Sequence, residues 1–313
     1  MRKMKLTKLL PLIGIGIFIY LVYSIGVQNI IDVFKNVRYG YLFLVIILAL
    51  IIPIMQTYKW SLILKKQGIN LKLYFLFKVQ LISALYGAIT PGRVGSLIKA
   101  NYIKNKTGKN LGESSSSVIL ERLVDFFVLA LFAMFGAFLL INYFSNLFWE
   151  LLVLVFILFL AVIFIFFKRE RTRFFLKFFH KHLVPKKYKE QASKLFHSFY
   201  DGLVHPKHLI KPFLISLLIW FLLFSQAYFS ALALSVNNVP FYYFFGLFPL
   251  GSIVGLIPVT IAGMGTKEAS LIGLFAIVGY GMADKIMAIT LLWSFSGLYL
   301  NILALYYIFR KHG

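Results

Sequence analysis

The chain has 313 residues, of which 60% are hydrophobic and only 14% carry a charged side chain, whereas a soluble domain carries about 25% charged residues. Apolar runs about as long as a bilayer crossing recur along the whole sequence, which excludes a soluble globular domain. The 33 Lys and Arg against 10 Asp and Glu lie mainly in short segments between these runs, where orientation signals and anionic-lipid contacts belong, so nucleic acid is not an expected partner. The chain lacks cysteine, which excludes disulfides, zinc-cysteine sites and thiol catalysis.

The first half of the sequence predicts an ordered series of helices. They are a retained first span over about 9–27, an interfacial helix over 28–40, a span over 41–64, a broken apolar pair over 74–104, and a long helix over 114–141. The long helix opens with four serines, which suit an N-terminal cap.

The second half predicts a similar series. It comprises a span over 147–167, a basic cytoplasmic segment over 168–211 that contains an interfacial helix, a span over 212–235, a broken pair over 241–280, and a last span over 286–309. Neither broken pair contains a piece long enough to cross a bilayer comfortably.

The distribution of basic residues predicts the topology. It places both termini and the 168–211 segment in the cytoplasm, and the uncharged loops 142–146 and 235–240 outside. These assignments agree only if each broken pair enters and leaves on the same face. We therefore expect an all-α polytopic membrane protein with about six spanning helices plus two re-entrant helical hairpins, forming a single transmembrane domain over 1–313. The same order occurs in residues 9–141 and 147–309, which predicts an inverted repeat. Eight plain spans with glycine-rich kinks are the alternative.

Two breaks at membrane depth are candidate parts of a binding site. The residues that interrupt the helices are Pro91, Gly92 and Gly95 in one half and Pro258, Gly263 and Gly265 in the other. Non-helical backbone is tolerated at this depth only where protein or a water-filled cavity covers it. Helix ends at such breaks offer N–H groups that suit a phosphate. Close helix packing through glycine is the alternative explanation.

Seven charged residues beside the breaks or within the long helix are candidate ligands for a lipid head group. They are Arg93, Lys99, Glu121, Arg122, Asp125, Lys267 and Glu268. A charge at mid-bilayer costs about 2.5–3.5 kcal/mol on insertion scales, so unpaired charges facing lipid are not expected. Two alternatives stay open: Arg93 and Lys267 as interfacial anchors, and the acids of the long helix as structural ion-pair partners of Lys99 or Arg93.

The same residues give little support for catalysis. Glu121 and Asp125 lie on adjacent turns of one helix and cannot flank a substrate from opposite sides. The first break is no P-loop, because Arg93 follows Gly92 where such a loop requires lysine. We therefore expect a protein that is not an enzyme, with no metal and no cofactor.

Three motifs resemble the flippase-like membrane family. They are Thr90-Pro91-Gly92-Arg93-Val94-Gly95, Val118-Ile119-Leu120-Glu121-Arg122-Leu123-Val124-Asp125, and Ala262-Gly263-Met264-Gly265-Thr266-Lys267-Glu268-Ala269. The best-known members form the transmembrane half of lysylphosphatidylglycerol synthases, the multiple peptide resistance factors. The resemblance covers about residues 8–310, and the Glu-Arg-x-x-Asp element is its most specific part.

The resemblance implies a lipid-flipping fold with paired re-entrant hairpins around a lipid-sized cavity. We expect no soluble synthase domain here, because the chain ends soon after its last span, and synthase activity is not carried over. The second glycine motif departs from the family, since Ala262 stands where a proline often precedes the glycine.

The leading hypothesis is a transporter in a prokaryotic cell membrane that moves a phospholipid or polyprenyl-linked lipid between leaflets. Its expected partners are membrane lipids of anionic or polyprenyl-phosphate type. The alternatives are an integral membrane transferase acting on lipid-linked substrates, or a non-catalytic partner of a separate lipid-modifying enzyme.

Overall fold

The computed structural model describes most of the chain outside one internal stretch. The described residues are 10–143, 150, 157, 197–199, 201–257 and 260–310. Within these ranges the fold is all α-helical, and the only extended pairing is an isolated bridge between Pro91 and Ile261. The described residues exclude Pro258, most of the predicted span over 147–167, and most of the basic 168–211 segment.

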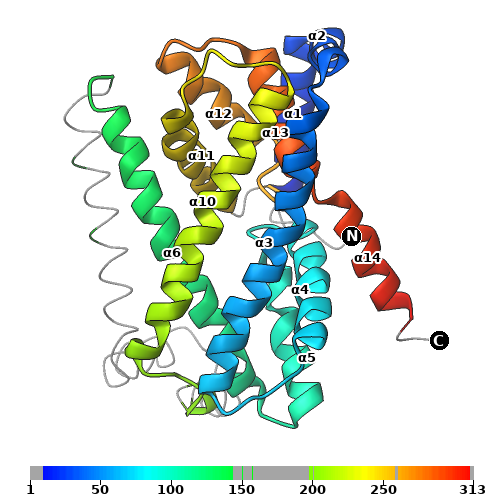
Figure 1. The fold of residues 1–313 in the computed structure, drawn as a ribbon, viewed down its shortest axis with the longest axis vertical. Helices are drawn as coiled ribbons and strands as arrows, with labels where there is room; N and C mark the ends of the chain where they lie inside the picture. The colour runs from blue at the N-terminus through cyan, green and yellow to red at the C-terminus, as the bar shows by residue number, and fades with distance from the viewer. Residues whose placement is uncertain are drawn as a thin grey trace, which may run out of the picture.

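The helices follow the predicted order. Those of the first half are α1 (Leu10–Ile25), α2 (Val27–Val33), η2 (Phe34–Asn36), α3 (Tyr39–Lys66), α4 (Leu73–Ala88), η3 (Val94–Leu97), α5 (Ile98–Thr107) and α6 (Leu111–Leu139). Those of the second half are η5 (Pro206–Leu209), α10 (Ile210–Ala233), α11 (Phe241–Leu256), α12 (Thr266–Ile277), α13 (Ala283–Phe295) and α14 (Leu298–Phe309). Figure 1 shows them as one elongated bundle.

Three helical stretches are long and apolar enough to cross a membrane. They are Tyr39–Lys66, Pro206–Ala233 and Ala283–Phe309, and a fourth is added if Gly14–Ile25 and Val27–Asn36, bent by 79°, count as one span. The bend sets α2 across the end of α1, as expected of a helix at a membrane surface. The all-helical membrane class is thus confirmed, while the number of six spans stays a prediction.

Each broken pair occupies one half of the bundle (Figure 1). α4 and α5 lie together in the lower half, and α11 and α12 lie together in the upper half. α4 and α11 have 16 residues each, so at about 1.5 Å per residue each is roughly 24 Å long, short of a hydrocarbon core of about 30 Å. This arrangement is the one that re-entrant hairpins require.

The tips of the two hairpins meet. Pro91 and Ile261 form the antiparallel bridge at this junction. Both tips have the sequence Thr-x-x-x-x-Gly followed by Ser or Thr, starting at Thr90 and Thr260. Both also turn through two consecutive left-handed residues, with φ of 59° and 56° at 92–93 and of 52° and 78° at 262–263. The two breaks therefore share sequence and backbone conformation.

Contacts between helices come in matching pairs. α3 packs along α10; α4 packs on α14, as α11 packs on α6; and α3 contacts α6, as α10 contacts α13. α6 and α11 cross at glycine, where a Cβ on Gly136 would lie 2.0 Å from the Gly246 carbonyl oxygen. These pairs agree with the predicted inverted repeat, which stays a prediction because its second copy lies partly outside the described residues.

The four serines at 114–117 do not cap a helix, and that prediction was wrong. α6 begins three residues earlier, at Leu111, and its N-cap is Asn110. Three of the serine hydroxyls, those of 115–117, donate to the carbonyl three residues before them. Serine satisfies its hydroxyl inside a helix in this way, and Ser114, Ser116 and Ser117 are buried.

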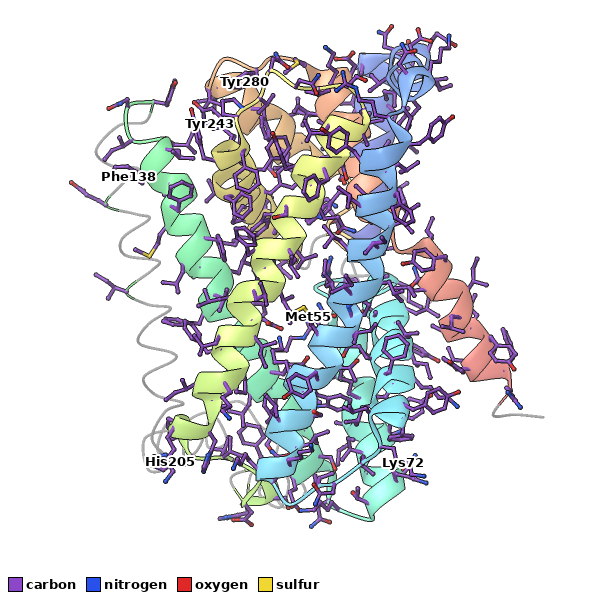
Figure 2. All side chains as sticks on the ribbon, in the orientation of Figure 1. Met55, Lys72, Phe138, His205, Tyr243 and Tyr280 are labelled. Carbon is purple, nitrogen blue, oxygen red and sulfur yellow. The ribbon has the colours of Figure 1, made fainter. Side chains whose placement is uncertain are left out.

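The two ends of the bundle differ in charge. Lys72 and His205 lie at one end, and Tyr243 and Tyr280 lie at the other (Figure 2). The lysines at 65, 66, 72, 104, 106 and 109 belong to loops and helix ends at the same end of the bundle as Lys72 and His205. The positive-inside rule predicts that this end faces the cytoplasm.

Candidate functional site

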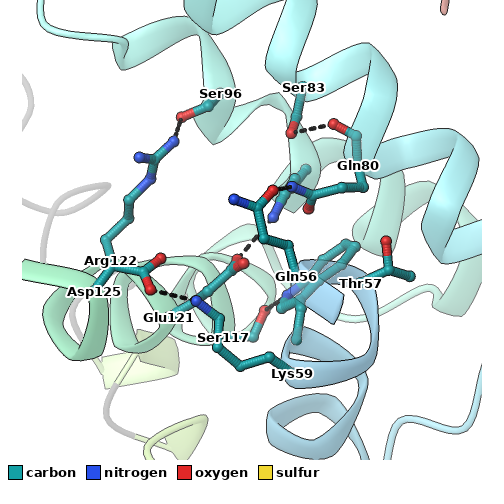
Figure 3. Close-up of polar contacts among 12 residues, drawn as sticks. Gln56, Thr57, Lys59, Gln80, Ser83, Ser96, Ser117, Glu121, Arg122 and Asp125 are labelled. Carbon is teal, nitrogen blue, oxygen red and sulfur yellow. Dashed lines mark hydrogen bonds and ion pairs between the residues drawn. The ribbon is translucent and has the colours of Figure 1, made fainter. Parts of the chain in front are cut away.

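The centre of the half of the bundle that carries these lysines contains a buried cluster of charged side chains (Figure 3). Its first component joins three helices. Lys59 on α3 is completely buried and forms an ion pair with Asp125 on α6. Ser216 on α10 donates a hydrogen bond to the same carboxylate. Asp125 of α6 thus binds side chains of both α3 and α10, the two helices that pack along each other.

The second component is the pair of Lys99 on α5 and Glu121 on α6. The two atoms, Nζ and Oε2, are 2.7 Å apart, and each residue is only 4% exposed. The Lys99 ammonium also lies 4.5 Å from the centre of the Trp60 ring. The Trp60 indole N–H in turn donates to Ser117 Oγ at 3.2 Å. The ion-pair alternative therefore describes these two residues correctly.

Two arginines, Arg93 and Arg122, lie beside these pairs. Arg122 donates to the hydroxyl of Ser96, which lies in η3 beside the first break. Arg93 is at the tip of that break in a left-handed conformation, and its side chain keeps exposed surface. Among the described residues, no acidic group forms an ion pair with either guanidinium. Both cations are available to an anionic ligand.

The second hairpin supplies Lys267 and Glu268 at the start of α12. Lys267 Nζ lies 3.3 Å from Glu268 Oε1 and donates to Ser294 Oγ at 2.5 Å. It also lies 5.1 Å from the centre of the Trp293 ring. Aligning the tips at Thr90 and Thr260 places Gly263 opposite Arg93. The cations of the two breaks are therefore not equivalent, and Lys267 is more fully satisfied than Arg93.

The cations of both hairpins belong to one cluster. Arg93 and Lys267 follow Pro91 and Ile261 by two and six residues, and the bridge between these two residues joins the tips, so the cluster extends across the junction of the tips. It contains five cations, Lys59, Arg93, Lys99, Arg122 and Lys267, and three carboxylates, Glu121, Asp125 and Glu268. Within the described part of the chain, two positive charges are left over. Arg93 is exposed and Arg122 is half-buried, so both surplus charges can pair with an anionic ligand that reaches the tip.

The backbone N–H groups at the breaks are largely satisfied within the protein. Gly95 N–H donates to Thr90 Oγ1 at 2.8 Å, and Gly265 N–H donates to Glu268 Oε2 at 2.7 Å. Glu268 thereby caps the N-terminus of α12. The predicted use of free N–H groups to bind phosphate has little support here, which leaves the arginine side chains as the principal ligands.

The glycines of the tips are required by close backbone approach. A Cβ on Gly95 would lie 2.4 Å from the Tyr86 carbonyl oxygen, and one on Gly265 would lie 2.3 Å from that of Gly14 in α1. Gly265 also has a φ of +83°, which favours glycine. Glycine is thus needed here both for close packing and for the reversal of the chain. A break at a binding site and close packing through glycine are therefore compatible explanations.

Sequence reasoning assigned no role to several members of the cluster. Lys59 and Gln56 stood out only as polar residues near the end of an apolar span, which is itself a signal of function. Gln80 Nε2 donates to Gln56 Oε1 at 2.8 Å, and its own Oε1 is buried without a partner in the described structure. Ser96, Ser216 and Ser294 carried no signal, because serine is common in membrane helices.

Comparison with known families gives one match over nearly the whole chain. The model of the lysylphosphatidylglycerol synthase TM region matches residues 9–304. The chain belongs to this family. All the charged cluster residues lie within the matched range. The resemblance based on the three motifs is therefore confirmed at the level of the family.

Two archaeal proteins that are similar to this chain both carry the name UPF0104 membrane protein. A UPF0104 membrane protein of Methanothermobacter thermautotrophicus is 24% identical over 310 residues, covering 92% of this chain and 88% of that protein. One of Methanocaldococcus jannaschii is 27% identical over 139 residues, covering 43% of this chain and 41% of that protein. Membership and these relatives support a lipid-related role in a prokaryotic membrane.

Proposed function

We propose that this protein is a lipid transporter that moves an anionic phospholipid or a polyprenyl-phosphate lipid between the leaflets of a prokaryotic cell membrane. The observation that carries the proposal is the pair of arginines, Arg93 and Arg122, beside the junction of two broken hairpins. A phosphate diester is an anion that guanidinium groups bind well, because their fork geometry matches its oxygens.

The rest of the cluster supports binding rather than catalysis. Glu121 is paired with Lys99, Asp125 with Lys59, and Glu268 with both Lys267 and the Gly265 N–H. A carboxylate used as a general base needs access to a substrate proton. These three are instead occupied by partners, so we propose that the protein has no enzymatic activity of its own.

An apolar groove suits the tail of such a lipid. It lies between α6, α10 and α11, has a volume of about 490 Å³, and is lined mainly by aromatic side chains, among them Phe132, Phe221 and Phe245. Phe132 is seven residues beyond Asp125 on α6, roughly 10 Å along the helix. A lipid with its head group at the arginines would thus have an apolar surface within reach of its chains.

Transport between leaflets requires that the site reach either side. Inverted repeats that meet at the midplane achieve this by rocking around a fixed site, with no need for hydrolysis. The matching contacts of the two halves support such a movement. Under this proposal both termini are cytoplasmic, and the basic end of the bundle faces the inner leaflet.

Reconstitution tests the proposal directly. The protein is placed in vesicles that contain head-group-labelled phosphatidylglycerol or phosphatidylcholine, and the label in the outer leaflet is reduced by an impermeant reagent. We expect labelled phosphatidylglycerol to become accessible faster than in protein-free vesicles. Rates equal to those of protein-free vesicles for phosphatidylglycerol, phosphatidylcholine and a polyprenyl phosphate would rule out the proposed function.

A further inference from the structure

A second cationic cluster lies away from the central one, where α14 packs on α4. Lys78 Nζ is 4.3 Å from the centre of the Tyr74 ring and 4.8 Å from that of Tyr307. The two tyrosine rings meet edge to face at 6.4 Å. On the same stretch of α14, Arg310 donates to the Tyr306 hydroxyl at 2.8 Å. Both segments thus have a tyrosine followed four positions later by a cation: Tyr74 and Lys78 within α4, and Tyr306 of α14 and Arg310 directly after it.

This cluster is positive and accessible. No acidic side chain forms an ion pair with Lys78 or Arg310 in the part of the chain that the structure describes. Tyr74 and Tyr306 are exposed. Lysine amines and tyrosine hydroxyls can both donate to phosphate oxygens. The cluster therefore offers several donors and two positive charges to an anion that approaches from the side of the bundle.

The cluster lies near one end of each of its two helices. Lys78 is five residues into α4, roughly 8 Å along the helix, and Arg310 directly follows the last residue of α14. Both lie toward the end that carries the basic loops. Tyrosine is enriched at this level of membrane proteins because its ring is apolar and its hydroxyl is polar.

The first helices of the two hairpins, α4 and α11, differ in the residue that stands where α4 has Lys78. α4 and α11 both have tyrosine as their second residue, Tyr74 and Tyr242, but the sixth residue is Lys78 in one and Gly246 in the other. Gly246 is needed for the close crossing with Gly136 of α6, whereas the same place in α4 carries a cation between two tyrosine rings. The lysine occurs on the side assigned to the cytoplasm, where anionic lipids create a negative surface potential.

We infer that Tyr74, Lys78, Tyr306, Tyr307 and Arg310 form a binding site for an anionic phospholipid of the cytoplasmic leaflet. The phosphate lies against the two cations, and the acyl chains run along the exposed apolar face of α14. The site binds a resident lipid at the outer surface of the bundle, so it does not depend on the transport function proposed above.

Quenching of a local fluorophore by brominated lipid measures this binding. Because the chain has no cysteine, a single cysteine can be placed at Ile302, one turn before Tyr306 on α14 and 70% exposed, and labelled with bimane. The reference label is placed at Ile54 on α3, which is 50% exposed. The protein is reconstituted in phosphatidylcholine with a fixed fraction of brominated phosphatidylglycerol or brominated phosphatidylcholine.

At Ile302 we expect phosphatidylglycerol to quench more than phosphatidylcholine, with little difference at Ile54. A contribution of about 1 kcal/mol per cation corresponds to roughly fivefold enrichment for each. A variant with Lys78→Gln and Arg310→Gln should lose this preference. The matched control, Lys65→Gln with Lys66→Gln, removes two exposed cations from the end of α3 and should retain it.

Three results would overturn the inference. The first is a preference that survives in the Lys78→Gln, Arg310→Gln variant. The second is an equal loss in the Lys65→Gln, Lys66→Gln control, which would indicate a diffuse surface potential. The third is stronger quenching by phosphatidylcholine, which would mean that the tyrosines bind a choline group.

Discussion

Replacing Lys99 with methionine removes one member of the most completely buried ion pair between α5 and α6. Its partner Glu121 is 4% exposed and accepts from Lys99 at 2.7 Å, so the variant leaves a carboxylate buried and unpaired. Breaking a buried pair in this way costs about 3–5 kcal/mol. The contact of the ammonium with the Trp60 ring, at 4.5 Å, is lost as well. We expect a loss of stability toward the upper part of that range.

Unfolding by SDS in mixed micelles, followed by tryptophan fluorescence, measures the loss. Trp60 reports on the site itself because it lies against the substituted side chain. Lys66→Met serves as the control, since Lys66 is exposed and such changes usually stay within about 0.5 kcal/mol. The double variant Lys99→Met, Glu121→Leu should recover most of the lost stability. Equal stability of Lys99→Met and Lys66→Met would refute the buried pair.

Three further predictions concern the tip, the second arginine and the topology. Gly265→Ala should destabilise the protein by about 1–3 kcal/mol or more, because its φ is +83° and a Cβ would lie 2.3 Å from a carbonyl oxygen of α1. Gly273 has open space around it, so the control Gly273→Ala should be neutral or stabilising in the same SDS titration. Arg122→Lys should fold normally and keep only part of the lipid transport measured in vesicles, since lysine does not bind phosphate bidentately. A cysteine at Asn238 should react with an impermeant reagent from outside intact cells and one at Lys66 should not; the reverse pattern would contradict the topology.

The sequence was sufficient to predict the membrane class and the breaks. Apolar run lengths determine where helices can cross, and proline and glycine in these runs determine where they are interrupted. The re-entrant arrangement was predicted from the basic residues, because all basic loops had to lie on the cytoplasmic face and each broken pair then had to enter and leave on one face. The re-entrant arrangement stays a prediction, and the structure adds the junction of Pro91 with Ile261. That contact joins residues far apart in the chain, so no local pattern could reveal it.

The partners within the cluster could not be predicted in the same way. Lys59, Asp125 and Ser216 come from three helices that are distant in sequence, and pairing depends on how those helices pack. The different surroundings of the cations at the two breaks became visible only in the structure, where the alignment of the tips places Gly263 opposite Arg93. The serines of α6 show a further limit, since serine is favourable both as a cap and as a buried residue that bonds its own helix.

Lipid movement by an Arg93→Gly variant tests the central claim most directly. Arg93 has a φ of 56°, a conformation that glycine adopts without strain, and Gly263 occupies the equivalent place in the other hairpin. The substitution thus removes the guanidinium while keeping the backbone, and no ion pair is broken among the described residues. We predict a variant that folds and inserts like the wild type, by size-exclusion profile and SDS titration, yet moves labelled phosphatidylglycerol no faster than protein-free vesicles, while Lys66→Gln retains full transport. Wild-type transport by well-folded Arg93→Gly would contradict the account.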